Sequence, residues 1–201
     1  MVLNRFTTIE KMLEILQTET IPMSDPNYWE DKNDSFILNI YKSKKKLKSL
    51  YALCFTIGSE TIYHWGAFSS KNEACCIEID SNSFNGICNK SGFRMKEVSY
   101  VSLKDLQSKV TDISQIPFLK RFPYWNEKEY RIIFESKKKT LRPSLALKRC
   151  NIKRITINQY LPKQLFDLIN EKIESVWKVT VTRSTIIKND RWVSYMEKLE
   201  I

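Results

Sequence analysis

The sequence YWNEKEYRIIF, residues 124–134, decides how the fold is interpreted, because its second half alternates between charged and apolar side chains. Successive side chains of a strand point to opposite faces, so this alternation predicts a β-strand over Tyr130–Phe134. One face would carry apolar residues for a core: Tyr130, Ile132 and Phe134. The other would carry an indole and three charged groups: Trp125, Glu127, Glu129 and Arg131.

Apolar segments on both sides of this stretch predict the remaining elements. The expected strands are Leu3–Phe6, Ile21–Met23, Leu50–Thr56, Ala74–Ile79, Phe93–Val101, Ile152–Ile157 and Val179–Val181. The expected helices are Thr8–Gln17, Glu60–Phe68, Ser81–Cys88, Leu103–Val110, Pro162–Val176 and Trp192–Leu199. An acidic, aromatic loop is expected from Ser24 to Asp34. Without repeats or a domain boundary, the pattern predicts a single α+β domain over residues 1–201. Its central sheet would be mixed or antiparallel and flanked by short helices.

The net charge of +10 is concentrated in two basic stretches, Lys42–Lys48 and Lys137–Arg154. Segregated positive charge favours an anionic partner, either nucleic acid or a phosphate-bearing nucleotide. Lysine runs are also common in solvated loops, and that alternative stays open. Residues 137–147 are the best candidate for a mobile loop.

The compartment and redox state follow from what the sequence contains. Its start lacks the basic and apolar regions of a signal peptide, and no window of about eighteen apolar residues could span a membrane. We therefore expect a cytoplasmic protein without membrane contact. The five cysteines are odd in number and form no CxxC pair, so we expect reduced thiols and no metal site. They are Cys54, Cys75, Cys76, Cys88 and Cys150.

Two groups of residues could carry chemistry. Glu127 and Glu129 are close enough for one carboxylate to have a raised pKa while Arg131 keeps the other ionised. A solvent-facing strand with cross-strand ion pairs is the alternative, and substitution of either glutamate by glutamine is expected to change stability little. The segment with Tyr63, His64 and Trp65 could wall a pocket between two strands. His64 is the only histidine in the chain, and it could equally be structural.

Several motifs in order resemble domain-of-unknown-function family 2971, which occurs in bacteria, often in phage-defence neighbourhoods. They are an arginine-aromatic strand at Arg5, SDPNYWED at 24–31, a CF…W…CIEID block at 54–80, WNEKEYRII at 125–133 and TRSTIIKNDRW at 182–192. The family implies a fold and a set of motifs but no settled reaction. The layout is in turn similar to that of ADP-ribosyltransferases, enzymes that use NAD.

That likeness implies roles for particular residues. Arg5 would hold a phosphate or ribose of NAD, and Trp65 or Tyr63 would stack on nicotinamide. Glu127 or Glu129 would bind the ribose and stabilise a positively charged transition state. The implied function is an ADP-ribosyltransferase-like or glycohydrolase enzyme of a defence or toxin system.

Two alternatives remain open at this point. The first is a non-catalytic nucleic-acid-binding module. The second is a metal-dependent nuclease using Glu135-Ser136-Lys137 and Asp112. The acceptor and the oligomeric state are left open.

Overall fold

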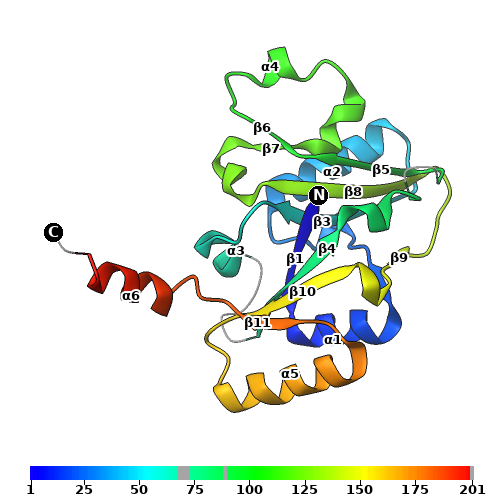
Figure 1. Cartoon of the computed structure of the whole chain (residues 1–201). Helices are drawn as coiled ribbons and strands as arrows, with labels where there is room; N and C mark the ends of the chain where they lie inside the picture. The colour runs from blue at the N-terminus through cyan, green and yellow to red at the C-terminus, as the bar shows by residue number, and fades with distance from the viewer. Residues whose placement is uncertain (68–72, 88–89, 200–201) are drawn as a thin grey trace.

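The computed structural model of the chain describes residues 1–67, 73–87 and 90–199, and its centre is a seven-stranded sheet (Figure 1). The strand order is β11-β10-β4-β1-β3-β8-β5, and only β10 and β11 run parallel. These strands are β1 (Val2–Thr8), β3 (Ser49–Ile57), β4 (Ala74–Asp80), β5 (Phe93–Glu97), β8 (Glu129–Ser136), β10 (Ile152–Ile157) and β11 (Val181–Arg183). The prediction of an α+β domain with a mixed sheet is confirmed.

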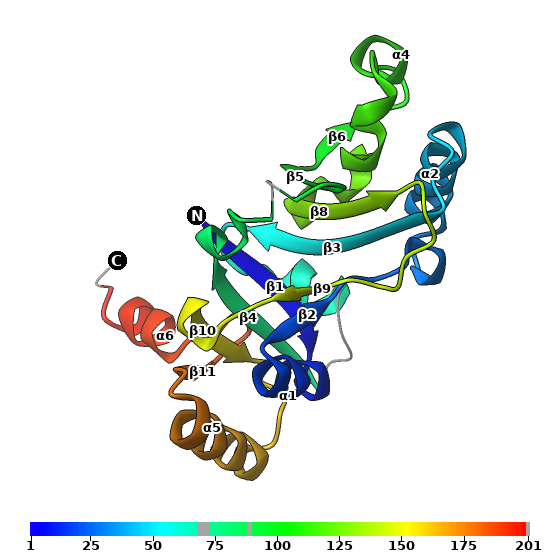
Figure 2. The same cartoon turned by 90° about the vertical axis from the view of Figure 1, so that its right-hand side faces the viewer.

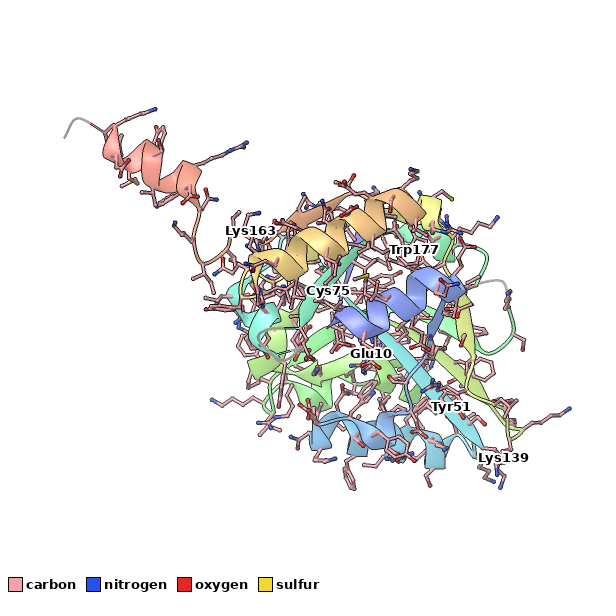
Figure 3. All side chains as sticks on the ribbon, turned by 90° about the horizontal axis from the view of Figure 1, so that it is seen from below. Glu10, Tyr51, Cys75, Lys139, Lys163 and Trp177 are labelled. Atoms are coloured by element: carbon pink, nitrogen blue, oxygen red, sulfur yellow. The ribbon has the colours of Figure 1, made fainter. Side chains whose placement is uncertain are left out.

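Two helices, α1 (Ile9–Thr18) and α5 (Lys163–Trp177), cover one face of this sheet (Figure 3). α1 begins where the side chain of Thr8 accepts the backbone amide of Lys11, and it buries one apolar face. The core beneath the helices includes Leu3, Met12, Leu53, Ile77, Ile132, Ile155 and Ile173. The alternation predicted for residues 130–134 therefore holds, because Ile132 points into this core.

The remaining elements are short. The other helices are α2 (Lys32–Lys44), α3 (Ile62–Ala67), α4 (Leu106–Lys109) and α6 (Asp190–Glu197). The 3-10 helices are η1 (Pro26–Tyr28), η2 (Ser81–Phe84), η3 (Ile113–Phe118), η4 (Phe122–Glu127) and η5 (Arg149–Asn151). Two further strand pairs are β2 (Thr20–Pro22) with β9 (Ser144–Ala146), and β6 (Ser99–Val101) with β7 (Leu119–Arg121). No helix in the described ranges is long and apolar enough to cross a membrane.

The expected loop up to Asp34 is wrong, because α2 begins at Lys32. The side chain of Asp31 accepts the backbone amides of Asn33 and Asp34, and this cap starts the helix. Leu38 and Tyr41 then bury one side of α2 against the sheet. Asp34 is consequently a buried residue of the first helical turn rather than a solvated loop residue.

Two other predicted elements differ from the structure. Phe93–Val101 forms two strands, β5 and β6, in different sheets, and Val98 between them donates to the carbonyl of Glu129 at 2.9 Å. The segment after Asp80 is a single 3-10 turn. Phe68 and Cys88 lie outside the described residues.

Within 137–147, the amide of Thr140 donates to Ser49 Oγ at 2.9 Å and β9 pairs with β2. The mobility of that segment stays a prediction.

The sheet is divided between β1 and β3. These strands pair only at Leu3 with Ile57 and at Asn4 with Thr56. β1 pairs with β4 over its whole length, Val2 to Thr8, and β3 pairs with β8 from Ser49 to Thr56. β1 and β3 meet at one end and diverge from it (Figure 2). The gap between them opens directly beside Asn4 and Thr56.

Candidate active site

Glu127 and Glu129 belong to different secondary-structure elements. The prediction that Trp125 and Glu127 share a strand face with Glu129 and Arg131 is wrong, since 122–127 is the 3-10 helix η4. Lys128 follows in the left-handed conformation with φ 44°, and β8 starts at Glu129. Glu129 and Arg131 share a strand face as expected. Trp125 instead lies on η4 with 48% of its surface exposed.

Arg131 is fully buried and binds two carboxylates. Its Nε lies 2.6 Å from Glu129 Oε1, and its Nη2 lies 2.9 Å from Glu129 Oε2. On the other side, Nη1 and Nη2 lie 3.2 and 2.7 Å from the two carboxylate oxygens of Asp34. Nη1 also donates to the carbonyl of Pro117 at 2.9 Å, and the guanidinium lies over Trp29. The planar donor fork is therefore matched to two carboxylates at once.

Lys120, on β7, joins Glu127 to this pair. Its Nζ lies 2.6 Å from Glu127 Oε2 and 3.4 Å from Glu129 Oε2. The same ammonium lies 4.9 Å from the ring centre of Tyr124. We call the five residues Asp34, Lys120, Glu127, Glu129 and Arg131 the charge cluster.

The charge cluster is closed to solvent, which overturns the alternative of a solvent-facing strand. Glu127 and Glu129 are only 4% and 3% exposed. Removing one member of a buried ion pair leaves a charge uncompensated and typically costs about 3–5 kcal/mol. The expectation that glutamine substitutions would change stability little, as at a surface, is therefore wrong.

The cluster fixes Glu129 as an anion. Burial alone would raise the pKa of Glu129, but the charge and hydrogen bonds of Arg131, with help from Lys120, lower it to about 2. Burial dominates at Glu127 and raises the pKa of that carboxyl despite Lys120. Burial likewise raises the pKa of Asp34. The two glutamates thus differ in the sense expected from the sequence, with Glu129 as the ionised one.

Asp34 and Lys120 were not found from the sequence. Asp34 was assigned to an acidic loop, and the capping motif at Asp31 was the signal that could have placed it on a helix. Lys120 stands in no periodic pattern. Its place in the site depends on the tertiary structure, in which η3 and η4 fold back beside β8.

Arg5 and Glu129 line one cavity at the gap between β1 and β3. We call this cavity the notch; its lining residues are Asn4, Arg5, Phe6, Cys54, Phe55, Thr56 and Glu129. Its volume is about 20 Å³, enough for one water or one hydroxyl group. Arg5 Nη1 donates to the carbonyl of Cys54 at 2.8 Å, across the gap between the strands. Burial lowers the pKa of Arg5.

Thr56 has an unusual position in the notch. It is 3% exposed, and its hydroxyl has no hydrogen-bond partner among the described residues. A buried unpaired hydroxyl costs free energy, so such groups generally have a partner in the functional state. A water molecule or a ligand atom at the notch would supply such a partner for the hydroxyl of Thr56.

The three aromatic residues of α3 make different contacts. Tyr63 donates from its hydroxyl to Glu127 Oε1 at 3.4 Å and so touches the charge cluster. His64 is buried; its Nδ1 accepts from the amide of Thr61, so its Nε2 donates to the carbonyl of Asn126 at 3.0 Å. Burial lowers the pKa of His64, which favours the neutral imidazole. Trp65 is buried beside Phe6 and donates to Glu60 at 2.7 Å.

The two lysine stretches meet in space. The amide of Lys48 donates to the carbonyl of Ser136 at 2.8 Å, and Ser49 Oγ donates to the carbonyl of Lys138 at 3.2 Å. We call the exposed side chains at this place the basic corner: Lys44, Lys45, Lys46, Lys48, Lys137, Lys138 and Lys139. Further along, Arg149 and Arg154 are paired with Glu19 and Glu78. The corner is thus the part of the two stretches where positive charge is most concentrated.

The residues of the nuclease alternative are engaged by other side chains. Glu135 accepts from Tyr41 and Arg94, and Asp112 caps η3. Within the described part of the chain, no three histidine, cysteine or acidic side chains are placed to hold a metal ion.

Comparison with known proteins gives similarity in structure only. No protein-family model and no curated protein matches this chain, so the resemblance to family 2971 stays a prediction. DarT of Thermus sp. 2.9 in complex with ADP-ribosylated single-stranded DNA is similar with a TM-score of 0.45 and 9% identity, covering 91% of this chain and 93% of that chain. The complex with carba-NAD⁺ gives 0.43, 7%, 92% and 95%, and the NAD⁺ complex gives 0.42, 9%, 91% and 94%. Similarity at this level assigns no activity to this chain.

Proposed function

We propose that this chain is an enzyme of the ADP-ribosyltransferase or glycohydrolase type, which cleaves the bond between nicotinamide and ribose in NAD. One observation carries the proposal. Arg5 and Glu129, which are far apart in sequence, line one notch together with the unpaired hydroxyl of Thr56. A cation and a hydroxyl can bind a phosphorylated ribose, and a fixed anion stabilises the positive charge that develops on the sugar.

The chemistry assigns the central role to Glu129. When the bond between the ribose carbon and nicotinamide breaks, the electron pair leaves with neutral nicotinamide and the sugar becomes positively charged. A carboxylate held as an anion stabilises that charge, as in glycosidases. A pKa of about 2 keeps Glu129 ionised at neutral pH. Because Arg131, which Asp34 holds from its other side, fixes Glu129 in place, the anion needs little rearrangement when the sugar becomes charged.

The other residues take supporting roles. Arg5 would bind the ribose or an adjoining phosphate through its guanidinium, and Thr56 would bind a ribose hydroxyl. Tyr63 is the partly buried aromatic beside Glu127 and would contact nicotinamide, whereas buried Trp65 instead supports Phe6 at the notch. Glu127, with its raised pKa, could exchange a proton with the attacking group.

The direct test measures nicotinamide release from NAD by the full chain and by the variant Arg5→Lys. This substitution keeps the positive charge but removes the planar fork, so we expect at least a tenfold loss of turnover with the fold retained. Arg142→Lys, at an exposed site in the 137–147 segment, is the matched control and should turn over like the wild type. Equal turnover by wild type and Arg5→Lys, or no NAD cleavage under any condition, contradicts the proposal.

A second function is favoured by the basic corner. Two stretches separated by about ninety residues in sequence meet there, as the bond between Ser49 and Lys138 shows. We infer that this corner binds a polyanion, with nucleic acid as the natural candidate, by neutralising phosphates. It lies at the far end of β3 and β8 from Thr56 and Glu129, so such binding could accompany catalysis or occur without it.

A further inference from the structure

A row of five polar residues crosses the sheet on the face opposite α1 and α5. The strand registers place them opposite one another in the order Arg154, Glu78, Asn4, Thr56 and Glu129. Residues directly opposite in antiparallel strands share a face, so all five side chains start from the same side of the sheet. With strands about 4.8 Å apart, the row spans roughly 19 Å. Its Glu129 end is the notch, and its Arg154 end is open.

The open half of this row lies in a groove of about 540 Å³. Asn4 belongs to the lining of both the notch and the groove, so the two spaces are neighbours on the same face of the sheet. Asn4 also donates from Nδ2 to the carbonyl of Gly58 at 2.7 Å, which holds the loop 58–60 along one side of the groove. A single side chain therefore positions both the entrance to the notch and the wall beside it.

The notch and the groove differ in the size of the chemical group that each can hold. The notch, at about 20 Å³, admits a single hydroxyl group, whereas the groove is within the range of about 300–1,000 Å³ usual for small-molecule sites. A ligand that places a ribose hydroxyl in the notch must therefore lay its larger part elsewhere. The groove is the neighbouring space of sufficient size, next to the notch at Asn4.

We propose that the groove binds the adenosine diphosphate portion of the dinucleotide, with Arg154 contacting a phosphate; the inference rests on the proposed function, which places the nicotinamide ribose at the notch. Arg154 keeps 49% of its side chain exposed, and its Nε donates to Glu78 Oε1 at 2.8 Å. This bond holds the guanidinium over the sheet. Ser59 and Thr156, which also line the groove, supply hydroxyls for the ribose of the adenosine.

The probe is ADP, which contains this portion and lacks nicotinamide. Its dissociation constant for the full chain would be measured by calorimetry for wild type, Arg154→Met and Arg149→Met. Arg149 is a matched control, because it is similarly exposed at 44% and is also paired with one glutamate, Glu19. We expect Arg154→Met to weaken ADP binding at least tenfold, or about 1.4 kcal/mol, and Arg149→Met to leave it unchanged.

Three results would overturn the inference: no ADP binding by the wild type, equal binding by Arg154→Met, or equal weakening in both variants. Thermal unfolding of each variant shows whether the fold is retained. The proposed function fails separately. If ADP binding depends on Arg154 but NAD is not cleaved, the nucleotide site stands without the reaction. If NAD is cleaved and Arg154→Met binds ADP normally, the reaction stands and this subsite does not.

Discussion

The two ends of the β3–β8 pair carry charge in opposite ways. At the end where Thr56 faces Glu129, the charges are buried and paired. At the other end, where Ser49 faces Ser136, seven lysines are exposed to solvent. The charge cluster holds two bases against three acids, a net charge of −1, so it hardly registers in the total of +10. The net charge of the chain therefore reflects the basic corner and gives no sign of the charge cluster.

The largest expected effect comes from breaking the buried end with Arg131→Met. Removing the guanidinium leaves Asp34 and Glu129 as buried carboxylates without their main partner, which should cost about 3–5 kcal/mol of unfolding free energy. For a chain of this size the thermal midpoint should fall by roughly 6–20 °C. Arg142→Met, at an exposed site, should stay within about 0.5 kcal/mol of wild type. Equal midpoints for the two variants would mean that the cluster does not hold this end together.

Acid sharpens the contrast, because the buried end depends on the depressed pKa of the Glu129 carboxyl. The folded-state pKa of Glu129, about 2, lies below its unfolded value, so its stabilisation is present above roughly pH 4.5 and is lost as the pH falls toward 2. The difference in unfolding free energy between wild type and Glu129→Gln should therefore shrink between pH 5 and pH 3. Denaturant titrations at several pH values measure it. A difference that stays constant over this interval contradicts the assignment.

Thr56→Val separates activity from stability at the buried end. The hydroxyl lost has no partner among the described residues, so the unfolding free energy should stay the same or rise by up to about 1 kcal/mol. NAD turnover should nevertheless fall at least tenfold, since the hydroxyl is proposed to bind the ribose. Thr7→Val, at an equally buried threonine of β1 outside the notch, serves as the control. Unchanged turnover in Thr56→Val would remove Thr56 from the site.

The smallest effect on the fold is expected at the exposed end. Replacing Lys45, Lys46 and Lys138 together by glutamine should change the unfolding free energy by no more than about 0.5 kcal/mol. Binding of a single-stranded oligonucleotide should weaken, and its logarithmic salt slope should fall by about 2, since each phosphate contact contributes about 0.7. Fluorescence titrations at several salt concentrations give the slope. A slope identical to that of the wild type would exclude this corner as the contact surface.

The sequence predicted the fold class and most elements because apolar periodicity is local information. The alternation at residues 130–134 and the helical spacing in α1 and α5 each depend on a few neighbouring side chains. Boundaries failed where a single polar contact decided them. Asp31 capped α2 and removed the expected loop, and the left-handed Lys128 ended η4 and set the start of β8.

Residue patterns predicted the candidate site only as far as it lies on one strand, and Arg5 on β1 was implied by the family resemblance alone. Glu129 and Arg131 are two residues apart on β8, so their shared face followed from parity. Asp34 and Lys120 join them through tertiary packing, which no local pattern records. The notch forms where β1 and β3 cease to pair. The sequence of either strand alone does not determine which strand it pairs with or where the pairing ends.

The closed charge cluster also restricts how this chain can change by mutation. Asp34 and Arg131 are 97 positions apart, yet replacing Arg131 alone leaves the charge of Asp34 buried without its main partner. Their substitutions should be epistatic, with the double replacement tolerated better than replacement of Arg131 alone. A lineage that replaces Arg131 would therefore have to replace Asp34 almost together with it, or first gain stability elsewhere. Substitutions in two distant segments of the chain therefore depend on each other.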